Sequence, residues 1–95
     1  MKLRQVPYGN KNICGANIER LRKEKRMSQG ALVAKMQLYG VDINPSSLSK
    51  LEGQTRIATD VELKAIARIL GVAMEALVRE EEEDEAWVLR SYTFG

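Results

Sequence analysis

Apolar side chains recur between residues 13 and 78 with the spacing of amphipathic α-helices. In the first such segment Cys14, Ile18 and Leu21 stand at positions i, i+4 and i+7, with charged side chains between them. This spacing places the three side chains on one helical face and predicts a helix from about residue 13 to residue 25. Cys14 belongs to that face, so we expect it to be a small buried hydrophobe.

Local capping signals bound a second helix between Ser28 and Gly40. Serine is a favoured N-cap residue, and a glycine provides a left-handed stop at the other end of a helix. Between these signals, Leu32, Val33 and Met36 recur at helical spacing. We therefore expect these three side chains to form the buried face of the second helix.

A third helix is predicted from Asn44 to about Leu51. Asn44 is a favoured N-cap residue, and Pro45 follows at the first helical position, where its missing N–H costs nothing. Leu48 and Leu51 are spaced i and i+3, so both point to the same side of this short helix. The remaining side chains then face away from the core; they are Ser46, Ser47, Ser49 and Lys50.

Two further helices complete the pattern. Thr59 and Glu62 form a capping box, and Gly71 is a typical C-terminal stop. The apolar face between them contains Leu63, Ile66, Ala67 and Leu70. Residues 72 to 78 predict a short fifth helix, and no strand signal has comparable strength. The expected fold is therefore all-α, a compact five-helix bundle.

The charge of the chain is unevenly distributed, although its 95 residues carry a net charge of only +2. Residues 1 to 56 hold eleven lysines and arginines against four acidic residues, a net charge of +7. Residues 57 to 95 hold four lysines and arginines against nine acidic residues, a net charge of −5. The first part can therefore attract a polyanion. Charge alone does not distinguish a surface that binds nucleic acid from an ordinary solvated surface.

Composition argues against an enzyme on chemical grounds. The chain has no histidine and one cysteine, so it cannot assemble an ordinary zinc site or a histidine-assisted nucleophile. We expect no enzymatic activity, no metal and no cofactor. Its apolar runs are shorter than the roughly 20 residues that a membrane span requires, and the N-terminus lacks the apolar core of a signal peptide. The expected location is the cytoplasm, with no membrane partner.

Three segments carry a family resemblance, and they read IERLRKEKRMSQ, LSKLEGQ and TDVELKAIARILGV, the last leading into MEALV. Through them, Ile13 to Val78 resembles the Cro/repressor-type helix-turn-helix domain of phage repressors and bacterial XRE-like regulators. The resemblance covers about two-thirds of the chain. It implies a five-helix fold and a bacterial or phage transcriptional regulator, a repressor, that reads double-stranded DNA in the major groove with residues 45 to 51.

The resemblance also implies which side chains contact DNA. Gln29 matches a glutamine that reaches a phosphate or a base edge, while Ser46 and Lys50 match positions that point into the groove. Lysine can donate to guanine, and Pro45 offers only apolar contact. The loop after the third helix matches a backbone clamp. The full expected set is Ser28, Gln29, Asn44, Pro45, Ser46, Ser47, Ser49, Lys50, Gln54, Thr55 and Arg56. The alternative for the serines is a solvated helix face.

Glu52 requires a cation, because an unpaired carboxylate close to phosphate would repel DNA. The resemblance pairs this glutamate with an arginine of the first helix, and Arg22 occupies the matching position. We expect the Arg22–Glu52 pair to lock the first helix to the third.

Two features depart from the family pattern. Gln37 to Tyr39 and Asp42 to Ile43 are additional residues, so we expect a longer second helix and a wider turn. Gly30 stands where relatives usually have a helix-favouring acidic residue, a cost of about 1 kcal/mol relative to alanine. Neither departure removes a core position.

The chain divides into three parts. Residues 1 to 12 predict a flexible basic arm, residues 13 to 79 the domain, and residues 80 to 95 an acidic and then aromatic tail. We expect the tail to mediate self-association through Trp87, Val88, Leu89, Tyr92 and Phe94. A homodimer would then bind an inverted-repeat operator. The alternative is an antitoxin-like or other protein-binding module that acts through this tail. No small-molecule ligand is predicted.

Overall fold

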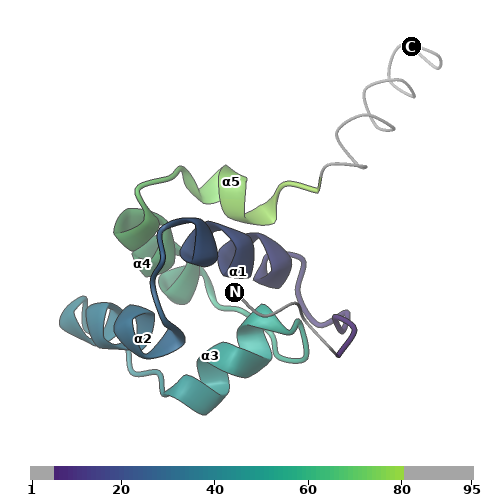
Figure 1. Cartoon of the computed structure of the whole chain (residues 1–95), viewed down its shortest axis with the longest axis horizontal. Coiled ribbons are helices and arrows are strands. Elements are labelled where there is room, and N and C mark those ends of the chain that lie inside the picture. The colour runs from purple at the N-terminus through teal and green to yellow at the C-terminus, as the bar shows by residue number, and fades with distance from the viewer. Residues whose placement is uncertain (1–5, 81–95) are drawn as a thin grey trace, which may run out of the picture.

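Five α-helices form the part of the chain that the structure, a computed structural model, describes, which is residues 6 to 80 (Figure 1). They are α1 (Gly15–Glu24), α2 (Gln29–Leu38), α3 (Pro45–Glu52), α4 (Asp60–Leu70) and α5 (Met74–Val78). No strand occurs within these residues, which confirms the all-α prediction. None of these helices has the length and apolar character needed to cross a membrane. The predicted self-association residues, from Trp87 to Phe94, lie outside the described residues.

The capping residues bound the helices as the sequence predicts. The side-chain oxygens of Ser28, Asn44 and Thr59 each accept a hydrogen bond from the backbone N–H three residues later, at 3.0, 2.8 and 3.2 Å. Gly40 and Gly71 adopt positive φ angles of 82° and 70°, a conformation that glycine reaches without steric cost. These local contacts satisfy backbone groups that the ends of a helix leave unpaired.

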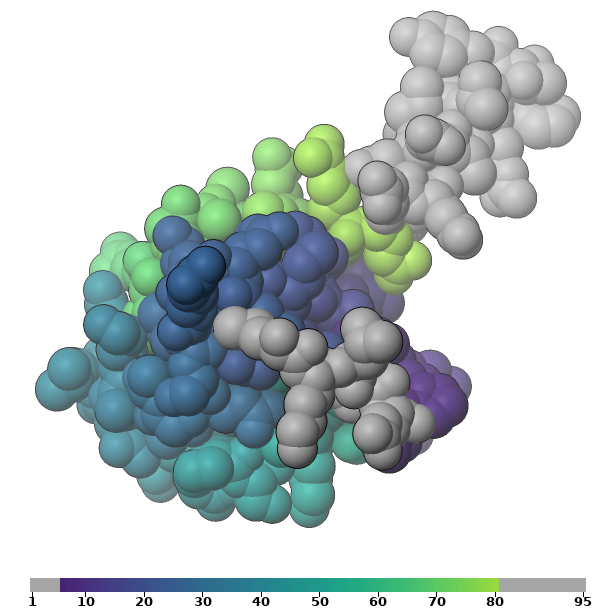
Figure 2. Space-filling model, in the orientation of Figure 1, coloured from purple at the N-terminus to yellow at the C-terminus, as the bar shows by residue number. Residues whose placement is uncertain are grey.

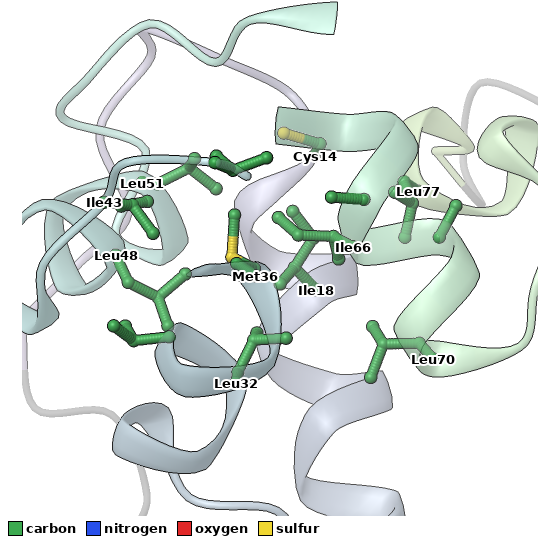
Figure 3. Packing of buried hydrophobic residues seen from close by; sticks show 14 residues of the cluster. Cys14, Ile18, Leu32, Met36, Ile43, Leu48, Leu51, Ile66, Leu70 and Leu77 are labelled. Atoms are coloured by element: carbon green, nitrogen blue, oxygen red, sulfur yellow. The ribbon is translucent and has the colours of Figure 1, made fainter. Parts of the chain in front are cut away.

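One apolar core joins all five helices (Figure 3). Its largest fully buried hydrophobic side chains are Ile18, Leu32, Met36, Leu48, Leu51, Ile66, Leu70 and Leu77. Cys14, 2% exposed, belongs to this core, as its position on the apolar face predicts. The inner side of α3 packs against both α1 and α2. The opposite side of α3 is therefore left at the surface.

The turn between α2 and α3 contributes to the core, which the sequence did not predict. Val41 and Ile43 are buried in it, although they lie outside both helices. The side-chain amide of Gln37 donates a hydrogen bond to the carbonyl of Ile43 at 3.0 Å. This turn is thus held by apolar burial and by a hydrogen bond from the end of α2.

The start of α1 differs from the prediction, because the helix begins at Gly15 and not near residue 13. The side-chain oxygen of Asn12 accepts hydrogen bonds from the N–H groups of Cys14 (3.0 Å) and Gly15 (2.8 Å). Its side-chain nitrogen donates to the carbonyls of Leu51 (3.0 Å) and Arg56 (2.7 Å). One asparagine therefore ties the start of α1 to the end of α3.

The structure also corrects the expectation of a flexible arm through residue 12. The N–H of Gly9 donates to the carbonyl of Gly53, and the N–H of Lys11 donates to the carbonyl of Gln54, both at 2.8 Å. The Tyr8 hydroxyl donates to Glu19 at 2.6 Å. Residues 8 to 12, here called the clasp, are thus attached to the domain. A segment without helical periodicity can still find hydrogen-bond partners for its backbone in a neighbouring loop.

Gly15 allows α1 and α3 to approach closely. A Cβ atom added to this residue would lie 2.3 Å from the carbonyl oxygen of Leu51 and 2.5 Å from that of Glu52. Both neighbours are backbone atoms, which cannot move aside as the end of a flexible side chain can. The position therefore tolerates only glycine without a shift of one helix relative to the other.

We predict that Gly15→Ala destabilises the fold by about 1–3 kcal/mol or more, because overpacking forces the backbone to shift. Gly30→Ala is the matched control, since an added Cβ there has its nearest neighbour, the Ser28 hydroxyl, at 3.9 Å. That change should stabilise α2 by about 0.5–1 kcal/mol. Urea unfolding of both variants measures the difference, and equal stability for the two would contradict the close approach.

Candidate nucleic-acid interface

The outer face of α3 is polar and exposed. Leu48, Leu51 and Glu52 are buried beneath it, so the helix has a clear inner and outer side. Ser47 is half-buried, and the exposed residues of the helix are Pro45, Ser46, Ser49 and Lys50. In the space-filling view the surface of α3 lies at the lower edge of the molecule, beside that of α2 (Figure 2). The structure therefore places the predicted groove-facing side chains of α3 on one accessible side.

A buried ion pair lies under this face. The Nε of Arg22 is 2.7 Å from Oε2 of Glu52, and the Nη2 of Arg22 donates to Oε1 at 3.0 Å. The two side chains are 8% and 0% exposed. A third hydrogen bond runs from the guanidinium of Arg22 to the carbonyl of Met27 at 2.7 Å. The pair thus links α1, the turn after α1, and α3, in the positions that the sequence predicts.

Gln29 joins the same network. Its Nε2 donates to Oε1 of Glu52 at 2.9 Å, and its side chain is half-buried at the first position of α2. The Glu52 network is defined here as Arg22, Gln29 and Glu52. The carboxylate accepts three side-chain hydrogen bonds, two of them from a cation, so its charge is compensated within the protein. Ser28 beside it is exposed at the start of α2.

The loop after α3 is held by its own side chains. The Oε1 of Gln54 accepts from the N–H of Ala16 at 3.0 Å, and its Nε2 donates to the carbonyl of Gly9 at 3.2 Å. The hydroxyl of Thr55 donates to the carbonyl of Lys50 at 3.2 Å. Gln54 therefore has a structural role that its predicted place in a backbone clamp did not indicate. Contact of Gln54 with DNA stays a prediction.

Arg56 also has an intramolecular partner that the sequence analysis missed. Its guanidinium donates twice to Glu62, at 2.9 and 2.7 Å. Burial favours a higher pKa for the Glu62 carboxyl, but the hydrogen bonds and charge of Arg56 and the hydrogen bonds from Thr59 lower that pKa below its ordinary 4.5. The Arg56 side chain remains 30% exposed. In the sequence, the only signal for this pair is that Arg56 has a charge opposite to that of Glu62 in the nearby capping box.

No exposed acidic side chain lies along the outer side of this segment. From Asn44 to Arg56 the only acidic residue is Glu52, which is buried and paired. Lys50 is exposed, and the other outward groups are hydroxyls, a side-chain amide and a proline. Such a surface has no exposed acidic group of its own to repel an anionic polymer, and it offers hydrogen-bond donors and acceptors at its centre.

Comparison with protein-family models, curated proteins and solved structures finds no match to this chain. The family resemblance of Ile13 to Val78 therefore stays a prediction.

We predict that Glu52→Gln destabilises the protein by about 3–5 kcal/mol, because it leaves the charge of Arg22 buried without a counter-charge. Glu24→Gln is the control: its partner Arg20 is 3.4 Å away, and the two side chains are 56% and 59% exposed. An exposed pair of this kind should contribute less than about 1 kcal/mol. Chemical denaturation of both variants measures the two changes in unfolding free energy. A change for Glu52→Gln as small as that for Glu24→Gln would contradict the prediction.

We predict that Glu62→Gln removes a pH-dependent part of the stability while keeping an oxygen for the capping box. Because folding lowers the pKa of Glu62, its carboxylate stabilises the fold above the ordinary pKa of 4.5, and this contribution disappears as the pH falls through the lowered pKa. The wild-type protein should therefore exceed the variant in unfolding free energy near neutral pH, and the difference should shrink in acid. Urea titrations from about pH 7 to pH 3 measure it. A difference that is constant with pH would contradict the assignment.

Proposed function

We propose that this chain is a sequence-specific double-stranded DNA-binding regulator, a transcriptional repressor, that inserts α3 into the major groove. The observation that carries the proposal is the outer side of α3, exposed and free of acidic groups above the buried Glu52. The major groove, about 12 Å wide, admits one α-helix. A helix of 8 residues with its inner side buried presents one row of side chains to such a groove.

In this proposal the outward side chains of α3 read the bases. Lys50 donates to guanine O6 and N7, which is a common base-specific contact. Ser46 and Ser49 donate or accept hydrogen bonds, and Pro45 contacts a thymine methyl. Hydroxyls discriminate weakly because they can pair with either kind of group, so Lys50 is the main source of base preference.

Contacts to the DNA backbone come from both sides of α3. The start of α2, with Ser28 and Gln29, presents a helix N-terminus whose N–H groups and dipole favour a phosphate. The Glu52 network fixes the position of Gln29 relative to α3. Beyond α3, Thr55 and Arg56 make further contacts to the DNA backbone. Such contacts fix the register of the protein on the duplex and carry no direct sequence information.

The fold proposed is the Cro/repressor-type helix-turn-helix. Supporting it are the order of the five helices, the packing of α1 and α2 against the inner side of α3, and the Arg22–Glu52 pair. The proposal includes a homodimer on an inverted-repeat operator, since a single domain of this size reads only a few base pairs. The antitoxin-like alternative depends on residues 81 to 95, which lie outside the described residues, and stays a prediction.

We predict that Lys50→Ala relaxes the preference at one base position, with a loss of about 1–3 kcal/mol in discrimination. Selection of bound duplexes from a random-sequence pool measures this change, and the wild-type chain should enrich an inverted repeat. Lys64→Ala is the control, because Lys64 is exposed on α4, which packs against α2 and α5. Absence of any enriched sequence with the wild-type chain, or an unchanged preference with Lys50→Ala, would contradict the groove assignment.

A further inference from the structure

The clasp lies directly against the loop that follows α3. In Figure 1 this N-terminal segment, drawn in purple, runs beside the turn at the end of α3. Two backbone hydrogen bonds of 2.8 Å join Gly9 to Gly53 and Lys11 to Gln54. Asn12 adds two more, to carbonyls on either side of the loop. The clasp and the loop therefore form one connected surface.

Close packing fixes the position of the clasp. A Cβ atom added to Gly9 would lie 2.5 Å from the carbonyl oxygen of Gln54, so the two backbones approach to a distance that only glycine permits. The side chain of Gln54 spans the same contact, because it binds both Gly9 and the start of α1. A residue in the clasp is thus held at a defined place next to Thr55 and Arg56.

Lys11 is the cation that the clasp presents. Its N–H is bound to Gln54, whereas its side chain is exposed and makes no ion pair with the residues that the structure describes. The charge of nearby Arg56 is shared with Glu62. On the clasp side of the loop, the charge of Lys11 is therefore not compensated by any acid among the described residues.

We propose that Lys11 binds a phosphate of the DNA backbone next to the Thr55–Arg56 loop, so that the clasp is part of the DNA-binding surface. This inference rests on the proposed function. A lysine ammonium is a compact charge on a flexible stem, which suits a phosphate contact whose exact geometry is not fixed. Because the backbone of Lys11 is already immobilised, binding would cost less ordering entropy than from a free arm.

The experiment measures how the affinity of the full chain for short random-sequence duplexes depends on salt, between about 50 and 200 mM. Each neutralised phosphate contributes about 0.9 to the slope of log affinity against log salt. We expect Lys11→Gln to reduce the magnitude of that slope by about one. Lys11→Arg, which keeps the charge, should retain the wild-type slope. Lys64→Gln is the matched control on α4 and should also retain it.

The possible results separate the two proposals. If the wild-type chain shows no salt-dependent binding, the proposed function fails and this inference fails with it. If the wild-type chain binds and Lys11→Gln keeps the same slope as Lys64→Gln, the role of Lys11 alone is overturned. If Lys11→Arg reduced the salt slope as much as Lys11→Gln, the role of Lys11 would also be overturned, because the charge of the side chain would then not be the cause of the reduction. Thermal unfolding verifies that all three variants remain folded.

Discussion

The ion pair between Arg22 and Glu52 is the contact on which both the position of α3 and the charge of its outer side depend. It joins α1 to α3 inside the domain, and Gln29 extends it to α2. It also places the only acidic side chain of α3 away from solvent, with its charge compensated. A free carboxylate at this place would oppose any anionic partner at the outer face of the helix. One buried contact therefore supports both the position of α3 and the function proposed for it.

Local signals in the sequence were enough to place most of the helices. Ser28, Asn44 and Thr59 cap helices through hydrogen bonds to backbone groups three residues away, so their neighbours in sequence determine the outcome. Gly71 ends α4 for an equally local reason. The Arg22–Glu52 pair spans 30 residues and was predicted from the family resemblance and from the need to neutralise a carboxylate.

Contacts between distant backbone segments could not be predicted. Asn12 binds carbonyls 39 and 44 residues away, and Gln54 binds one 45 residues away. Neither residue type indicates such a partner, because a side-chain amide can pair with almost any backbone group. The role of Gly9 could not be predicted either: the sequence predicts a flexible arm at this position, whereas the missing side chain of Gly9 allows the two backbones to approach closely. These contacts place the clasp against the loop after α3 and thereby enlarge the candidate site.

The most direct test of the central claim, that the outer side of α3 meets DNA, is an NMR titration of the ¹⁵N-labelled chain with a short random-sequence duplex. Backbone amide shifts report which surface the duplex touches. The proposed function predicts that the largest changes occur along α3, at the start of α2 and in the loop after α3. Changes confined to α4 and α5, or no changes at low salt, would contradict it.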